Sequence, residues 1–292
     1  MTFVIILSAA FCIGLGFVLQ QRAAQDAPPE DLLSVRLLVD LIRKPRWLLG
    51  IAVMVVGQLL GAVALGRADV TLVEPLLTCN LLFALGLARL ISAQTLGRRE
   101  WCGTLVLLVG VTVFVVAGRP RSAEAPVDDL RRLAVVLGVC AVAAVFVVAS
   151  KRRSGSGKAV LLAAAAGTLY GLQDGFTRRA MLALDGGVAR LVVSWSTYLV
   201  IVVALVGLLL AQSAFGAAPL RASLPAMTVA EPLSGIVLGV GVFGEVVRLA
   251  PLWLGLESAC LLAMLIGIVL LARSPHLHAH LTRRRRIRNA AC

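Results

Sequence analysis

Two short strings decide the fold: TLVEPL at residues 71–76 and TVAEPL at residues 228–233. They share Thr, Glu, Pro and Leu at a separation of 157 residues, and Glu-Pro occurs at no other place in the chain. The same offset, without a gap, relates Gly14 to Gly171, Arg22 to Arg179, and the triplet 108–110 to the triplet 265–267. Matches in three pairs of apolar segments at one offset indicate an internal duplication.

The composition predicts that these segments cross a membrane. Of the 292 residues, 60% are hydrophobic and 15% are charged, whereas an ordinary soluble domain has roughly 45 to 50% apolar residues. A bilayer span needs ~20 mainly apolar residues, so the chain can supply nine spans and leaves little for a soluble catalytic domain. The predicted spans are residues 2–20, 47–66, 70–93, 101–117, 132–150, 159–179, 190–212, 222–244 and 250–272.

The duplication and the span count together predict an all-α polytopic membrane protein with an inverted repeat. Spans 1–4 correspond to spans 6–9 around span 5, so corresponding helices cross the membrane in opposite directions, as in secondary transporters. The predicted units are a first repeat, a linker with span 5, a second repeat and a basic tail, at residues 1–120, 121–157, 158–274 and 275–292. Residues 31–46 carry six charged residues among their leucines, which favours an interfacial amphipathic helix over a tenth span.

The charge distribution predicts the orientation and the partners. The net charge of +13 comes from short Lys and Arg clusters between apolar runs, where anionic lipid rather than nucleic acid is the expected partner. The loops after odd-numbered spans and the tail hold about twice as many of these cations as the opposite side. Because cytoplasmic loops retain Lys and Arg, we expect a multi-pass protein of the cell membrane with its N-terminus outside and its C-terminus inside.

Several motifs resemble one transporter family. They are GLGFVLQQR at 14–22, EPLL at 74–77, EPL at 231–233, FGE at 243–245 and LIGIVLL at 265–271. They are similar to the drug/metabolite transporter (DMT) superfamily, in its EamA-like branch, over nearly the whole chain. The resemblance implies transport of a metabolite, an amino acid or a drug-like solute. The nine-span layout also resembles NIPA-type magnesium transporters, since ten spans are usual in the EamA-like branch.

The repeated glutamates Glu74 and Glu231 are the sharpest site candidates. Pro75 and Pro232 lack an N–H and therefore leave the carbonyls four residues before them without helical partners. A carboxylate beside free backbone oxygens could bind a proton, a metal ion or an ammonium group. The alternative is that Thr-x-x-Glu is a capping box at the start of each helix.

Other polar residues within the spans are candidates for binding a substrate or an ion. The carboxylates Asp174 and Glu257 lie inside apolar runs, and an intramembrane carboxylate is by default a functional-site hypothesis. A helix-end ion pair with Arg178 is the structural alternative for Asp174. The cavity candidates are Gln58, Asn80, Gln173, Tyr170, Trp195 and Tyr198, for which helix-to-helix hydrogen bonding is the alternative.

Small residues and cysteines predict packing. Gly167, Gly171 and Gly175 share one face of span 6, which allows close approach of another helix within the monomer or in a homodimer. Five of the six cysteines lie inside apolar runs, which predicts buried thiols rather than a disulfide framework.

The residue inventory disfavours an enzyme. All three histidines, His276, His278 and His280, are in the basic tail, and the chain has no hydrolase or metalloprotease motif. No cofactor is expected. The favoured function is secondary active transport of a small solute by alternating access. The alternatives are magnesium transport, which would use carboxylate oxygens, and a non-transporting membrane scaffold.

Overall fold

The computed structural model describes residues 2–65, 67, 73, 76–92, 97–117, 128–184, 187–244 and 251–272, and these are helical apart from short turns. The elements, in chain order, are α1 (Thr2–Gln25), the 3₁₀ helix η1 (Pro29–Asp31), α2 (Val35–Ile42), α3 (Pro45–Leu65), α5 (Asn80–Ser92), α6 (Arg98–Ala117), α7 (Asp129–Lys151), α8 (Gly155–Leu184), α9 (Val188–Val193), α10 (Trp195–Ala217), α11 (Leu220–Val242) and α12 (Pro251–Ala272).

The chain is a polytopic membrane protein. Among the described residues, five helices are long and apolar enough to cross a bilayer, namely α1, α3, α7, α10 and α11, and shorter apolar segments lie in α5 and α12. Helices satisfy every backbone polar group internally, which a segment surrounded by lipid requires.

Three predicted segments differ from the observed helices. The predicted span 70–93 is interrupted by a turn at Thr78 and Cys79, and the span 190–212 is interrupted at Ser194, between α9 and α10. The predicted interfacial helix 31–46 is shorter, because Ser34 caps α2 by accepting a hydrogen bond from the Arg36 amide (3.1 Å) and Pro45 already begins α3. The prediction of buried thiols is confirmed for Cys260 but is wrong for Cys102 and Cys140, which are exposed.

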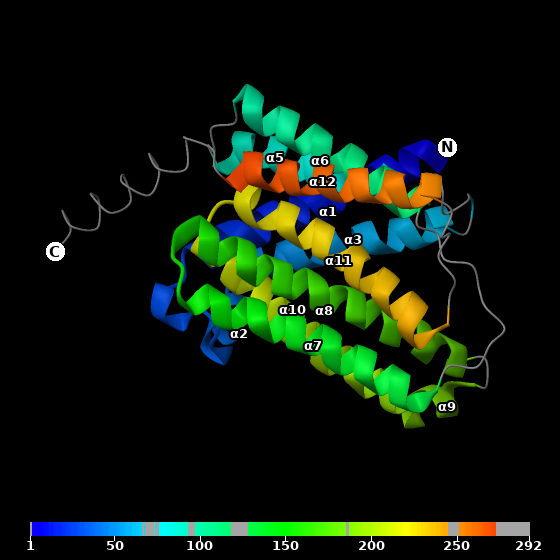
Figure 1. Ribbon diagram of the computed structural model, residues 1–292. Coiled ribbons are helices and arrows are strands. Elements are labelled where there is room, and N and C mark those ends of the chain that lie inside the picture. Colours follow the sequence, from blue (N-terminus) through cyan, green and yellow to red (C-terminus); the bar gives the residue numbers. More distant parts are fainter. Residues whose placement is uncertain are drawn as a thin grey trace.

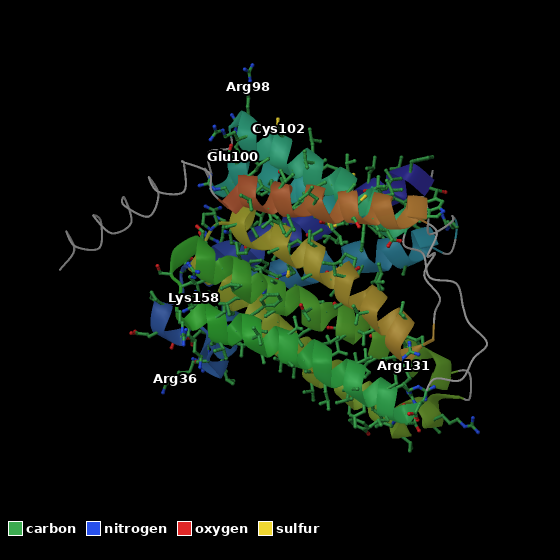
Figure 2. All side chains as sticks on the ribbon, viewed as in Figure 1. Arg36, Arg98, Glu100, Cys102, Arg131 and Lys158 are labelled. Carbon is green, nitrogen blue, oxygen red and sulfur yellow. The ribbon has the colours of Figure 1, made fainter. Side chains whose placement is uncertain are left out.

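The bundle has two ends, which we name after one labelled residue each. Figure 2 shows Arg36, Arg98 and Lys158 at one end, here called the Arg36 end, and Arg131 at the other, here called the Arg131 end. Arg36, Arg98 and Lys158, which the sequence predicts on the cytoplasmic side, therefore lie at the same end of the bundle.

One helix pair packs with a two-fold relation. Figure 1 shows α6 and α12 side by side at one edge of the bundle. A Cβ built on Gly103 would lie 3.3 Å from the Gly267 carbonyl oxygen, and one built on Gly110 would lie 3.3 Å from the Cys260 carbonyl oxygen. The 157-residue offset converts Gly103 to Cys260 and Gly110 to Gly267, so it exchanges the two contacts. Such reciprocal contacts are the property of an interface between two copies related by a two-fold axis.

A second corresponding pair of helix contacts differs in register. A Cβ on Gly14 of α1 would lie 2.8 Å from the carbonyl oxygen of Asn80 in α5, and a Cβ on Gly171 of α8 would collide with the carbonyl oxygen of Glu231 in α11. Because the 157-residue offset aligns Glu231 with Glu74, an identical register would place Gly14 against Glu74, six residues before Asn80. The two contacts therefore differ by six residues of sequence.

Candidate functional site

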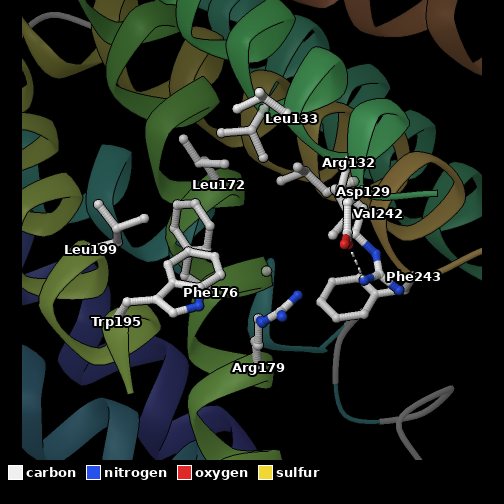
Figure 3. A pocket seen from close by; sticks show the side chains of 13 residues that line it. Asp129, Arg132, Leu133, Leu172, Phe176, Arg179, Trp195, Leu199, Val242 and Phe243 are labelled. Atoms are coloured by element: carbon white, nitrogen blue, oxygen red, sulfur yellow. Dashed lines mark hydrogen bonds and ion pairs between the residues drawn. The ribbon is translucent and has the colours of Figure 1, made fainter. Parts of the chain in front are cut away.

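A cavity of about 270 Å³ lies near the Arg131 end, between α7, α8, α10 and α11. Most of its wall is apolar, and three aromatic rings, two guanidinium groups and one carboxylate also line it (Figure 3). Its lining residues are Asp129, Arg132, Leu133, Val136, Leu172, Gly175, Phe176, Arg179, Trp195, Leu199, Leu238, Val242 and Phe243. We call it the arginine cavity.

Helix ends place the aromatic and cationic groups of the arginine cavity. Phe176 and Arg179 lie near the end of α8, and Trp195 begins α10 after the break at Ser194. The Phe176 and Trp195 rings meet edge to face with centroids 6.0 Å apart, and the Arg179 guanidinium lies 4.9 Å from the Trp195 ring centroid. Figure 3 shows the Arg179 side chain extending toward the space between Trp195 and Phe243. The indole face thus holds one cation at the cavity wall.

The second guanidinium is held by an exposed carboxylate. Arg132 Nη1 donates to Asp129 Oδ1 at 2.9 Å, and the exposed fractions of the two side chains are 34% and 94%. An ion pair with so exposed a carboxylate contributes little to the stability of the fold, because water screens the two charges. Within the described residues, Arg132 Nε is buried and has no hydrogen-bond partner. The cavity therefore carries an excess of positive charge over an apolar wall.

A band of titratable side chains lies where α8 contacts α11, with Tyr170 and Glu231 partly buried and Asp174 exposed. Glu231 of α11 is within electrostatic range of Asp174 and Tyr170, both on α8. The helices can approach closely here because Gly171 faces the backbone of α11, and Gly207 of α10 faces the Tyr170 ring at 2.9 Å from a built Cβ. The predicted close packing at the glycines of span 6 is confirmed, and the contacted helix is α11.

The capping-box interpretation of the second string is wrong. The helix α11 begins at Leu220, so Thr228 lies two turns inside it, and the Thr228 hydroxyl donates to the Leu224 carbonyl oxygen at 3.0 Å. Pro232 is likewise inside the helix, where its missing N–H removes a hydrogen bond. Glu231 is therefore in the middle of a proline-containing helix and does not cap a helix start.

Polar contacts join α1 to α10 near the Arg36 end. Gln212 Nε2 donates to Gln20 Oε1 at 2.7 Å, and Gln21 Nε2 donates to the Ala218 carbonyl oxygen at 3.3 Å. All three glutamine side chains are at most 2% exposed. The Leu33 amide also donates to Ser213 Oγ at 3.0 Å, which ties the segment before α2 to α10.

A buried pair of opposite charges lies in the same region. Arg221, at the start of α11, is fully buried, and Glu100, at the start of α6, is 2% exposed. The Glu100 carboxylate acts electrostatically on the Arg221 guanidinium and accepts a hydrogen bond from the Gly97 amide at 2.7 Å. Buried charges need such partners because desolvation is costly. Together with the glutamine contacts, the pair forms a buried polar layer near the Arg36 end.

The predicted site residues are not gathered in one place. Glu231, Asp174 and Tyr170 lie close enough to interact, and Trp195 lines the arginine cavity. Gln58 and Tyr198 are exposed, whereas Asn80, Gln173 and Glu257 are partly buried. Within the described ranges, the Oε1 atoms of Gln173 and Glu257 are buried without a hydrogen-bond partner. Glu74, Pro75 and the tail histidines lie outside the described residues.

Sequence reasoning missed the two arginines of the cavity. Arg132 and Arg179 are 47 residues apart and each borders an apolar run, so each resembles an ordinary interfacial anchor. The sequence does contain one signal for these arginines. Both are predicted on the side of the membrane opposite to the cytoplasm, where the usual charge bias makes arginines less frequent.

Comparison with known proteins gives the family. The model of the EamA-like transporter family matches residues 1–116, which is nearly the predicted first repeat. An uncharacterized protein from Corynebacterium glutamicum is 31% identical over 272 residues, which cover 92% of this chain and 93% of the relative. The chain belongs to the EamA-like transporter family. No solved structure is significantly similar to this EamA-like chain. As a multi-helix membrane protein of this family, it is associated with transport of small solutes.

Proposed function

We propose that this protein is a secondary active transporter that moves a small solute by alternating access. It consists of two inverted repeats, residues 1–120 and 158–274, around the linker 121–157. The reciprocal contacts of Gly103 with Gly267 and of Gly110 with Cys260 support this arrangement, because the sequence offset exchanges them.

The observation that carries the proposal is the difference between the two ends. Buried contacts of Gln20 with Gln212 and of Glu100 with Arg221 close the Arg36 end, whereas a cavity lies near the Arg131 end. An alternating-access transporter needs one closed end and one accessible end at a time. The charge bias supports placing the Arg36 end in the cytoplasm and the N-terminus outside, and in that orientation the cavity faces outward.

The titratable band is the proposed place for a coupling ion. Glu231 and Asp174 lie near each other and near Tyr170, at the contact between α8 and α11. A proton or a small cation shared by the carboxylates would reduce their mutual repulsion, and its release would alter that helix contact. This gives ion binding a route to the conformational change. Glu74 is the proposed counterpart in the first repeat.

Two other functions remain alternatives. Within the described ranges, no group of three His, Cys, Asp or Glu side chains could hold a metal ion, so no observation there favours magnesium transport. A scaffold would need neither an accessible cavity nor unequal ends.

A cross-link tests the proposal. In a background with the native cysteines replaced by serine, Gln20→Cys/Gln212→Cys should be bridged across the Arg36 end by a short bis-methanethiosulfonate, because the ends of the native side chains meet at 2.7 Å and the shorter cysteine side chains need a spacer between them. A substrate is first identified by thermal-shift screening of amino acids, nucleosides, cationic drugs and divalent metals, since a bound ligand stabilises the folded state. Cross-linking should abolish uptake into proteoliposomes and reduction should restore it, while each single variant stays active under both conditions. Undiminished uptake by the fully cross-linked protein would refute alternating access at this end, and no uptake of any ligand by the wild type would favour the scaffold.

A further inference from the structure

The arginine cavity has two chemically distinct parts. Leu133, Val136, Leu172, Leu199 and Leu238 contribute an apolar wall, which Phe176 and Phe243 extend. Arg132 and Arg179 bring guanidinium groups to the same cavity from two different helices, α7 and α8. Figure 3 shows the Arg132 and Arg179 side chains on the same side of the cavity as Phe243, with Leu172 and Leu199 on the other side.

The charges in the cavity do not cancel. Asp129 is the single acidic residue among the lining residues, and its 94% exposed side chain is in water. Arg179 lies over the Trp195 ring, and Arg132 retains a buried Nε without a hydrogen-bond partner among the described residues. Both groups can therefore donate to a further acceptor. Guanidinium groups recognise carboxylates and related anions through two parallel N–H donors.

The volume limits the size of the occupant. A cavity of about 270 Å³ is just below the ~300 to 1,000 Å³ that is typical of sites for drug-sized ligands. Gly175 contributes no side chain to the wall, and a Cβ there would already lie 3.4 Å from Leu238. One short apolar group with one charged head is therefore the chemistry that the cavity fits.

We propose that the arginine cavity binds a small amphipathic organic anion, such as an aryl- or alkyl-carboxylate, with its carboxylate at Arg132 and Arg179 and its apolar part against Phe176 and the leucines. The assignment of this anion as the transported solute rests on the proposed function. The binding of the anion to the arginine cavity does not depend on the proposed function.

The test compares three probes that differ only in the head group: 4-phenylbutyrate, 4-phenylbutylamine and 4-phenylbutanol. Binding to the purified full-length protein is measured by equilibrium dialysis in a neutral detergent, with protein-free micelles subtracting the partition of each probe. The carboxylate should bind at least about tenfold more tightly than the amine and the alcohol. Arg179→Gln and Arg132→Gln should each weaken carboxylate binding about tenfold, as expected for loss of one charge-assisted hydrogen bond.

Arg190→Gln is the matched control, because Arg190 is an exposed arginine of α9 that does not line the cavity. It should leave carboxylate binding unchanged. Thermal stability of each variant shows whether it is folded, and Arg179→Lys, which keeps the charge, should weaken binding less than Arg179→Gln. Equal binding of the three probes, or equal loss in the Arg190 variant, would overturn the proposal. Complete displacement of the probe by one to two equivalents of phosphatidylglycerol would also overturn it, since the site would then hold lipid.

The outcomes also separate this inference from the proposed function. A protein that binds 4-phenylbutyrate with the expected arginine dependence but moves no solute in proteoliposomes would refute transport and leave the anion site standing. A protein that transports a solute but shows no preference for the carboxylate would refute the anion site and leave transport standing.

Discussion

Replacement of Gln212 by leucine should open the Arg36 end more often. The substitution removes the 2.7 Å hydrogen bond to Gln20 and leaves the Gln20 amide oxygen buried without that donor. Hydrogen bonds between membrane helices contribute ~0.6 kcal/mol on average and up to ~1.7 kcal/mol. A loss of about 1 kcal/mol from the closed end corresponds to about a fivefold shift of the equilibrium toward the inward-open state.

The shift can be measured with a thiol reporter that needs no substrate. Ala218 is 3% exposed at the contact between α1 and α10, so Ala218→Cys should react with an impermeant maleimide only when the Arg36 end opens. With the native cysteines replaced by serine, the labelling rate in inside-out vesicles should rise about fivefold in Gln212→Leu, in proportion to the open population.

The double variant distinguishes this explanation from general destabilisation. Gln20→Leu/Gln212→Leu removes both polar groups and leaves neither unsatisfied. Its labelling rate should therefore be lower than the rate expected if the free-energy effects of the two single substitutions were additive. Ser34→Ala, which removes only the cap of α2, should leave the rate unchanged. An unaltered rate in Gln212→Leu, or a rise of equal size in Ser34→Ala, would refute the role of the glutamine contact in closing this end.

Three further substitutions test the contact between α8 and α11. Gly171→Ala should lower the free energy of SDS unfolding by ~1 to 3 kcal/mol, because its Cβ collides with the Glu231 carbonyl oxygen. Gly138→Ala, whose Cβ meets no atom within 4 Å, should leave that free energy unchanged. An equal loss in both variants would contradict the close packing at Gly171. Glu231→Gln should fold normally and abolish the pH dependence of uptake, while fully pH-dependent uptake would exclude Glu231 as the coupling residue. Gly175→Ala should fold normally, since its Cβ would lie 3.4 Å from Leu238. It should slow labelling of the Ala218→Cys reporter if α11 slides along the Gly175 face of α8. An unchanged labelling rate would argue against sliding.

Much of the fold follows from local sequence patterns. Seven of the nine predicted spans fall on one helix each, because a run of apolar residues must form internal hydrogen bonds in lipid. The close contact at Gly171 was predictable for the same local reason, since small residues at helical spacing create a flat helix surface. The breaks at Thr78 and Ser194 were not predictable from hydropathy, which averages over one or two polar residues in an apolar run.

The candidate site was predictable only in part. Tyr170 and Asp174 are one turn apart on one helix, so their proximity follows from helix geometry, and their approach to Glu231 follows from the contact of α8 with α11. The meeting of Arg132 with Arg179 depends on how α7 packs against α8, which no local pattern contains. The buried partner of Glu100 was missed because Arg221 resembles any arginine at a helix start.

In the proposed inverted repeat, the unequal ends follow from a difference in helix contacts between the two halves. An inverted duplication whose halves packed identically would have two equivalent ends, because the two-fold relation exchanges them, and such a protein would be open or closed at both. The contact of α6 with α12 keeps the two-fold relation. The contact of α1 with α5 departs from that of α8 with α11 by six residues, and the chain is broken at Thr78 and Cys79 in the first repeat but continuous through Pro232 in the second. We therefore expect α6 and α12 to act as the pivot, and expect the opposite state to arise when the two proposed repeats exchange these helix contacts.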